Sequence, residues 1–199
     1  MAPPVGLLIG HSFVHGLASH LSSDPQPTGS YLARKLNLNR LIQELHMHGE
    51  RGSRVCSSSF SLPHRLLTRV KPDFFILDLA AGAHPFDVAA KLNSIADRLH
   101  NQYHVRTVVI CSILYRKSHL RNLTRDQFTQ AAFDTNSLLK RSTAASPRTI
   151  YHVHKGFWTT PISQWSRDGV HPNSFHGRKN YIKAIRCAVF SALQTFTSR

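Results

Sequence analysis

The chain has 199 residues, of which 41% are hydrophobic and 18% are charged. Its length favours one domain, residues 1–199, around one core, and the absence of any run of about 18 apolar residues excludes a membrane-spanning helix. The 25 Lys and Arg against 10 Asp and Glu give a formal charge of +15. Such an excess favours a polyanionic partner, either nucleic acid or an anionic membrane surface.

Cysteine usage and the first residues indicate a compartment. Cys56, Cys111 and Cys187 are an odd number of cysteines without paired spacing, so we expect reduced thiols. The first residues lack the basic and apolar regions of a secretory signal peptide. Together these features predict an intracellular protein, cytoplasmic or nuclear.

Residues 5–9 form a short apolar run that predicts a buried strand, followed by Gly10, His11 and Ser12. Phe13, Leu17 and Leu21 lie four apart, which predicts a helix after the turn. Ser12 would then lie at the carboxyl end of the strand, the edge of a parallel sheet where ligands bind. The alternative is that Ser12 is a turn residue or helix cap without chemistry.

The rest of the chain alternates apolar strands with amphipathic helices. A polar, proline-containing loop is expected at 22–30, and a helix that begins at Pro63 extends to residue 70. Thr124 and Gln127 have the spacing of a capping box. We expect strands at 41–47, 73–79, 105–114 and 149–153, and further helices at 88–99, 124–139 and 181–196. This order predicts an α/β fold, a parallel sheet with helices on both faces.

A second polar motif lies between the last strand and the last helix. Asp168 stands three residues before His171 in a loop bounded by glycine and proline. A carboxylate there can hold the Nδ1 proton of the imidazole and leave Nε2 free to accept a proton from a serine. Since this loop and Ser12 emerge at the same sheet edge, they can meet. The alternative is that Asp168 caps the helix and His171 is an ordinary loop residue.

These motifs, in this order, resemble those of the SGNH, or GDSL-like, hydrolases. The resemblance extends from Ile9 to the final helix, and residues 168–181 are most similar to the SGNH domains that eukaryotic retrotransposons encode. It implies a three-layer α/β/α, flavodoxin-like fold with a five-stranded parallel sheet in the order 2-1-3-4-5. It also implies a serine esterase that works through an acyl-enzyme and needs no cofactor.

The resemblance assigns roles to individual residues. Ser12 resembles the nucleophile, with Asp168 and His171 as acid and base. The oxyanion hole would combine the backbone amides of Ser12 and Gly52 with the side chain of His84. The substrate would be a small acyl ester of the acetyl type, in a shallow site walled by Phe86 and Tyr115.

Two positions depart from the pattern of the family. His11 precedes the nucleophile where the family usually has Asp, and His84 stands where its oxyanion-hole Asn is expected. An imidazole N–H can donate to an oxyanion as an amide does, so His84 can serve. The alternative is a catalytically weak or inactive SGNH-like module of a mobile element that binds nucleic acid or an anionic membrane surface.

Basic and histidine-rich segments complete the set of candidates. Arg116, Lys117, Arg121 and Arg125 follow the fourth strand and could bind RNA, DNA or anionic lipid, or could form an ordinary solvated surface. The pairs His46 with His48 and His152 with His154 could each bind a metal. In the strand order of the family these pairs lie on opposite edge strands, too far apart to bind one ion together. We therefore expect no metal site.

Overall fold

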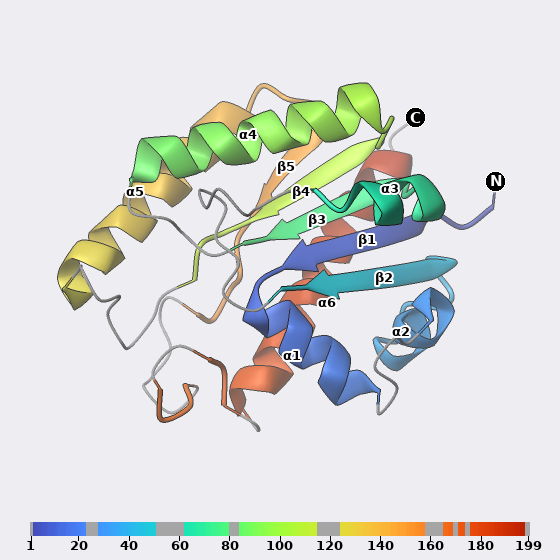
Figure 1. Ribbon diagram of the computed structural model, residues 1–199, viewed down its shortest axis with the longest axis horizontal. Helices are drawn as coiled ribbons and strands as arrows, with labels where there is room; N and C mark the ends of the chain where they lie inside the picture. Colours follow the sequence, from blue (N-terminus) through green and yellow to red (C-terminus); the bar gives the residue numbers. More distant parts are fainter. Residues whose placement is uncertain are drawn as a thin grey trace.

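The computed structural model describes residues 2–22, 28–50, 62–79, 84–114, 124–157, 165–168, 171–173 and 176–197. Within them lies a five-stranded parallel sheet in the order β2-β1-β3-β4-β5 (Figure 1). This confirms the α/β class and the order that the resemblance implies. The strands are β1 (Val5–Gly10), β2 (Glu44–Gly49), β3 (Phe74–Asp78), β4 (Thr107–Cys111) and β5 (Thr149–His152).

Helices cover both faces of the sheet, which makes the three layers. One face carries α3, α4 and α5, and the opposite face carries α1, α2 and α6 (Figure 1). The first group is α3 (His64–Val70), α4 (Pro85–Gln102) and α5 (Arg125–Thr143). The second group is α1 (Ser12–Leu21), α2 (Gly29–Lys35) and α6 (His176–Thr197).

The two cores follow from the alternation of side chains along each strand. Leu7 of β1 points to the α4 side, whereas Leu8 points to the α6 side. All residues of β3 and β4 are buried because helices cover both of their faces. This explains why the central strands read as continuous apolar runs. Cys111 is buried at the end of β4 and Cys187 is exposed on α6, and both are free thiols.

Several elements differ in their bounds from those expected, such as β4 (Thr107–Cys111, expected at 105–114) and α6 (His176–Thr197, expected at 181–196). Three further differences have a local cause or concern a whole element. The helix α2 was not predicted, because the polar loop was expected to reach residue 30. In the structure Thr28 caps α2, since its hydroxyl accepts a hydrogen bond from Tyr31 N at 3.3 Å. β2 begins at Glu44 rather than at residue 41, because Leu41 N and Ile42 N both donate to the carbonyl of Leu38 in a tight turn.

The start of α3 is the third difference. Pro63 is the residue before the helix and not its first helical residue. The capping box of α5 is confirmed, since Thr124 and Gln127 exchange side-chain to backbone hydrogen bonds of 3.2 and 2.8 Å. In the described part of the chain, no helix combines the length and apolar character needed to cross a membrane.

Candidate active site

The turn after β1 is where the candidate site begins. A Cβ on Gly10 would lie 2.5 Å from the carbonyl oxygen of Asp78 and 2.2 Å from a methyl group of Val14. Only glycine fits between these atoms. The chain can therefore leave β1 beside β3 and enter α1 at once, with Ser12 as the first residue of the helix.

His11 caps α1 in the position where an Asp was expected by resemblance. Its side chain is buried, and its Nδ1 accepts a hydrogen bond from Phe13 N at 3.3 Å. The acceptor role puts the proton of the neutral imidazole on Nε2. An acidic cap would accept the same hydrogen bond, so the substitution preserves the start of the helix.

Ser12, His171 and Asp168 form a continuous hydrogen-bonded chain. Ser12 Oγ lies 2.8 Å from His171 Nε2, and His171 Nδ1 lies 2.6 Å from Asp168 Oδ2. The second carboxylate oxygen of Asp168 accepts from the backbone N–H of His171 at 2.9 Å. Asp168 thus binds His171 through both its ring and its backbone, and the contact with the ring keeps the Nδ1 proton in place. Such an arrangement can remove the proton of a serine hydroxyl.

The loop that carries His171 is held at both ends. Trp165 forms an antiparallel bridge with Pro172, and Ser166 N donates to the carbonyl of His171 at 2.8 Å. Beyond it, Asn173 Oδ1 accepts from Gly177 N at 2.8 Å in the first turn of α6. Asn173 therefore serves the helix start, while Asp168 binds His171. The alternative expectation, in which Asp168 caps the helix, does not describe these contacts.

An aromatic contact joins the two halves of the site. The ring of Phe13 lies with its centroid 5.5 Å from that of His171 and 5.7 Å from that of Tyr181 on α6. Phe13 is buried, whereas the side chains of His171 and Asp168 are 43% and 49% exposed. The imidazole is thus supported from below by an apolar ring and open to solvent above, which leaves room for a substrate.

The other expected site residues are only partly placed. Gly52, Arg116, Lys117, Arg121 and Tyr115 lie outside the described residues. His84 is the N-cap of α4, at the carboxyl edge of the sheet, where its exposed side chain makes no capping hydrogen bond. The next aromatic residue, Phe86, is 73% exposed, and Arg125 is exposed at the start of α5.

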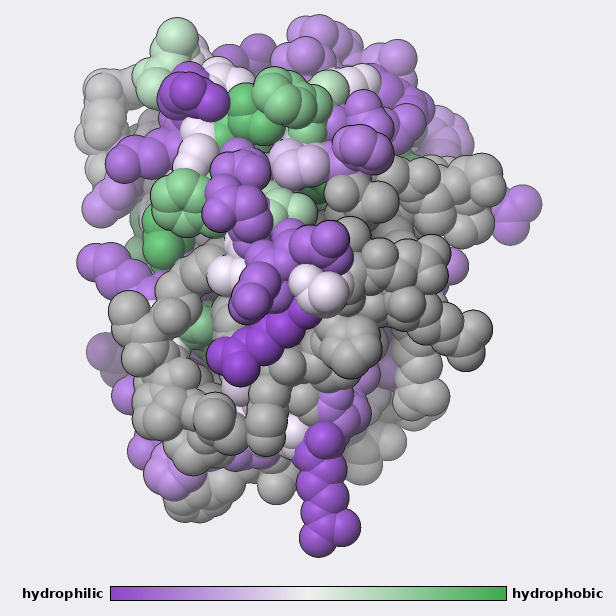
Figure 2. All heavy atoms as spheres, turned by 90° about the vertical axis from the view of Figure 1, so that its left-hand side faces the viewer, coloured by the Kyte–Doolittle hydropathy of each residue, from purple (hydrophilic) through white to green (hydrophobic). Residues whose placement is uncertain are grey.

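The carboxyl edge of the sheet faces the viewer in Figure 2. Hydrophilic side chains dominate the described surface in this view, and apolar side chains gather toward its top. The high ratio of basic to acidic residues in the sequence suits such a surface.

A separate hollow of about 780 Å³ lies beside β2, lined among others by His15, His46 and Arg69. Neither Ser12 nor His171 lines it, so it is not part of the hydrogen-bonded chain described above.

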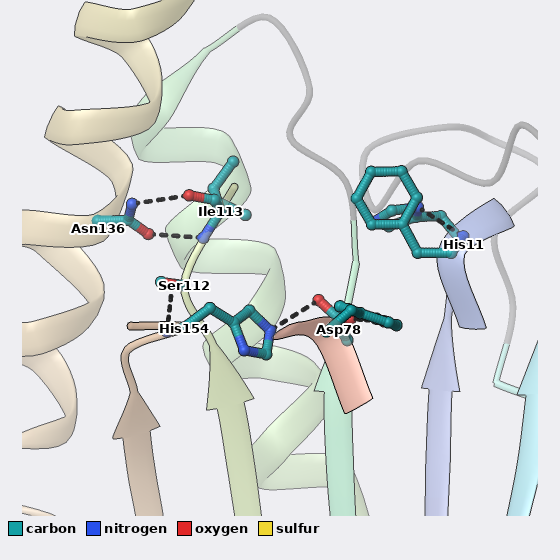
Figure 3. A network of polar contacts seen from close by, with 8 residues as sticks. His11, Asp78, Ser112, Ile113, Asn136 and His154 are labelled. Atoms are coloured by element: carbon teal, nitrogen blue, oxygen red, sulfur yellow. Dashed lines mark hydrogen bonds and ion pairs between the residues drawn. The ribbon is translucent and has the colours of Figure 1, made fainter. Parts of the chain in front are cut away.

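A buried polar network lies under the site, and the sequence analysis missed it. Tyr181 Oη donates a short hydrogen bond to Asp78 Oδ2. His154 Nε2 lies 3.3 Å from Asp78 Oδ1 (Figure 3). Burial alone would raise the pKa of Asp78, but the charge and hydrogen bond of His154, followed by His11, hold that pKa below its usual range. Asp78 is therefore ionised. The sequence feature that could have predicted this network is Asp78 itself, a carboxylate at the end of an otherwise apolar strand.

The neighbours of Asp78 respond to their burial and to its charge. Burial, followed by the charge of Asp78, raises the pKa of the Cys111 thiol and that of Tyr181 well above their usual values. Burial, followed by the charge of His154, lowers the pKa of His152 to about 4. These groups are neutral at pH 7, so the negative charge of this network resides on Asp78.

His46 and His48 lie on β2, and His152 ends β5 at the opposite edge of the sheet, with His154 two residues beyond it. His46 Nε2 lies 2.6 Å from Glu44 Oε2, which pairs it within β2. His152 Nδ1 contacts Ser191 Oγ on α6 at 3.1 Å. Neither pair combines with the other.

Comparison with known proteins supports the fold. No protein-family model matches the chain, and no curated protein matches it in sequence. Similar solved structures include an acetylxylan esterase from Geobacillus stearothermophilus, with a TM-score of 0.62 and 14% identity over 94% of each chain. A GDSL-like lipase from Bacteroides thetaiotaomicron has a TM-score of 0.55 and 14% identity over 96% of this chain and 88% of its own. TesA has a TM-score of 0.65 and 14% identity over 94% of this chain and 99% of its own. The fold is that of the SGNH hydrolases.

Proposed function

We propose that the protein is a serine esterase that hydrolyses small acyl esters, of the acetyl type, through an acyl-enzyme. The observation that carries the proposal is the unbroken chain of hydrogen bonds from Ser12 Oγ through His171 to Asp168. The esterases among the solved structures with this fold support the reaction class.

In the first half of the reaction, Ser12 Oγ attacks the acyl carbon and His171 Nε2 takes the hydroxyl proton. Asp168 keeps the imidazole oriented and stabilises its positive charge. His171 then gives the proton to the leaving alkoxide, so the alcohol departs and the acyl group remains on Ser12 as an ester.

In the second half, water replaces the alcohol. His171 takes a proton from the water, the resulting hydroxide attacks the acyl-serine, and the proton returns to Ser12 as the carboxylic acid leaves. The oxyanion formed in each half would accept hydrogen bonds from the backbone N–H of Ser12, the backbone N–H of Gly52 and the side chain of His84. Ser12 N–H suits this role because the first amides of a helix lack an intrahelical acceptor. Protein groups supply every proton transfer, so the mechanism needs no cofactor.

Labelling with a fluorophosphonate probe tests the nucleophile directly. The probe phosphonylates a serine only where a base activates its hydroxyl, so mass spectrometry of the native protein should find the adduct on Ser12. Heat-denatured protein should carry none, and the Ser19→Ala variant, changed on an exposed serine of the same helix, should label normally. An unlabelled native protein would refute the proposal.

A second function is favoured by one observation, the formal charge of +15. In this proposal the chain is a catalytically weak SGNH-like module, like those of retrotransposons, that binds nucleic acid or anionic lipid through its basic residues. His84, in place of the expected asparagine, supports weak activity. Fluorophosphonate labelling separates the two functions, since a module without an activated serine should not react.

A further inference from the structure

A cluster of metal-binding side chains lies beneath the proposed active site. Asp78 ends β3, Cys111 ends β4, and His154 lies two residues beyond β5. One ligand atom from each of the three lies within 4.8 Å of the others, and the residues are 2%, 2% and 0% exposed. Figure 3 shows the imidazole of His154 extending from the end of β5 across β4 toward Asp78.

Hydrogen bonds hold the backbone around this cluster. His154 N donates to Ser112 Oγ at 3.0 Å, which fixes His154 beside the end of β4. The side chain of Asn136 on α5 holds Ile113 by two hydrogen bonds, of 2.8 Å to its N–H and 3.1 Å to its carbonyl (Figure 3). These hydrogen bonds fix the backbone next to Cys111 and at His154.

The distance between Asp78 and His154 fits two ligands of one ion better than it fits a hydrogen bond. A charge-assisted N–H···O⁻ contact normally spans about 2.7–2.9 Å. His154 Nε2 and Asp78 Oδ1 are 3.3 Å apart. Two ligands each about 2.0–2.1 Å from a tetrahedral zinc ion lie roughly 3.3–3.4 Å apart. The separations that involve Cys111 are at most 4.8 Å, so they would have to shorten by no more than about 1.3 Å to reach the roughly 3.5 Å of a zinc site.

Charge also favours a divalent cation. Within the described residues, the ion-pair partner of the buried Asp78 carboxylate is a histidine, and no Lys or Arg reaches it. A carboxylate, a thiolate and a neutral imidazole around Zn²⁺ sum to zero net charge, so the ion can take over from the histidine charge in balancing the buried Asp78 carboxylate. Among the described residues, no group hydrogen-bonds the other ring nitrogen of His154, Nδ1, which is also buried.

We propose that Asp78, Cys111 and His154 bind one zinc ion. On binding, Cys111 loses its proton to solvent and coordinates as a thiolate, while one nitrogen of neutral His154 and one oxygen of Asp78 complete the set. The hydroxyl of Tyr181, which already contacts Asp78, offers an oxygen for the fourth position. The ion joins the ends of β3, β4 and β5, so its role is structural and does not depend on the proposed esterase function.

Zinc and cobalt binding to the full chain test the site. The Cys56→Ser/Cys187→Ser protein, which keeps Cys111 as its one cysteine, is titrated with Zn²⁺ and with Co²⁺ under reducing conditions. We expect one equivalent of metal, a thiolate-to-cobalt charge-transfer band, and a higher melting temperature with zinc than with a chelator. Adding Cys111→Ser should abolish the band and weaken zinc binding by at least about 10-fold.

Metal can also bind to surface histidines outside the proposed site. Such binding differs from binding at Asp78, Cys111 and His154 in two ways. Surface histidines give no thiolate band, and their metal survives Cys111→Ser. The His48→Ala variant, changed on the exposed edge strand, should keep both the stoichiometry and the band. His154→Gln provides a second ligand variant if Cys111→Ser fails to fold. Absence of the band in the parent protein, or zinc retained equally by Cys111→Ser, would show that the cluster is only a hydrogen-bonded network.

Discussion

Ser12 Oγ and His171 Nε2 lie 2.8 Å apart although 159 positions separate the two residues in the chain. The serine comes from the turn after β1, and the histidine from the loop before α6. Both segments reach the carboxyl edge of the sheet because β1 and the strands beside it are parallel. This contact makes the proposed chemistry testable residue by residue.

Ser12→Ala should abolish ester hydrolysis because it removes the hydroxyl that His171 contacts. With p-nitrophenyl acetate, we expect kcat to fall by about 10⁴-fold or more, to the rate of the buffer. The matched Ser19→Ala protein should keep the full rate. Equal rates for wild type and Ser12→Ala would refute Ser12 as the nucleophile.

Asp168→Asn should leave the loop in place but lose the acceptor that holds the Nδ1 proton of His171. A change of this kind can lower kcat by about 10⁴-fold while the substrate still binds, so KM should change little. Asp134→Asn, at a half-buried carboxylate of α5 outside the hydrogen-bonded chain of Ser12, His171 and Asp168, is the control. Steady-state kinetics distinguish the effects, and a change confined to KM would contradict the role given to Asp168.

His84→Ala tests the part of the proposed oxyanion hole whose residue type departs from the pattern of the SGNH hydrolases. If the imidazole donates to the oxyanion, its loss should lower kcat by about 10²–10³-fold, and His84→Asn should recover part of the activity. His64→Ala, on exposed α3, should have no such effect. Unchanged kcat in His84→Ala would leave the oxyanion to the backbone amides.

A preference for short acyl chains should accompany the activity. The proposed site is shallow, and Phe86 is 73% exposed instead of forming the wall of a deep pocket. We therefore expect kcat/KM to fall from acetate to butyrate to octanoate esters of p-nitrophenol. An increase along this series would indicate a longer acyl pocket.

Folding stability should fall below pH 6.5 in part because of His100. Its buried ring lies 2.8 Å from the carbonyl of Val105 and 3.0 Å from the hydroxyl of Thr149, and burial lowers its pKa from 6.5. A histidine with a lowered pKa takes up its proton more readily in the unfolded chain. Its contribution to stability is thus present above about pH 6.5 and is lost as the pH falls below it.

Urea unfolding at pH 7.5 and pH 5.5 checks this prediction. The free energy of unfolding should drop more between these values for wild type than for His100→Gln. Comparing the two drops cancels the contributions of the other histidines. Equal drops would mean that His100 does not titrate differently in the folded and unfolded states.

Binding of a polyanion should be steep in salt if the basic residues serve it. Between roughly 50 and 200 mM salt, affinity for single-stranded RNA should fall by about two to five orders of magnitude, as several phosphates are neutralised. Bound RNA should also slow ester turnover, because these basic residues follow the carboxyl end of β4 in the sequence. The patch variant replaces Arg116, Lys117, Arg121 and Arg125 with glutamine.

The control variant replaces four exposed basic residues of α4 and α5, namely Lys91, Arg98, Lys140 and Arg141. It loses the same formal charge away from the patch. If both variants weaken RNA binding equally, the charge acts as a whole and not through a site. If the affinity for RNA does not change with salt concentration, these basic residues form an ordinary solvated surface and not a binding site.

Local patterns explain why most of the fold was predictable. The apolar runs of β1, β3 and β4 are continuous because both faces are covered, and the capping box at Thr124 marks the start of α5. α2 escaped prediction because it is short and begins with a glycine inside a polar segment. Pro63 lies one position outside α3, a shift that propensity alone does not resolve.

The site was predictable only where its contacts are local. Asp168 and His171 are three residues apart, so their pairing could be expected from spacing, whereas the contact with Ser12 depends on the sheet. The Asp78 network escaped because its members come from three different strand ends and a helix, and each one alone looks like an isolated polar residue. Tertiary packing, and not sequence spacing, brings them together.

The hydrogen bond from Tyr181 to Asp78 has a consequence for the alignment of the two halves of the site. Tyr181 lies on α6, and the loop that bears His171 is tied to the start of the same helix through Asn173. A slide of α6 by one residue along its axis would be about 1.5 Å, enough to separate His171 from Ser12. The hydrogen bond of the buried Tyr181 therefore fixes the position of α6 along its axis. Through α6, this contact inside the protein sets the position of His171, whose side chain is nearly half exposed to solvent.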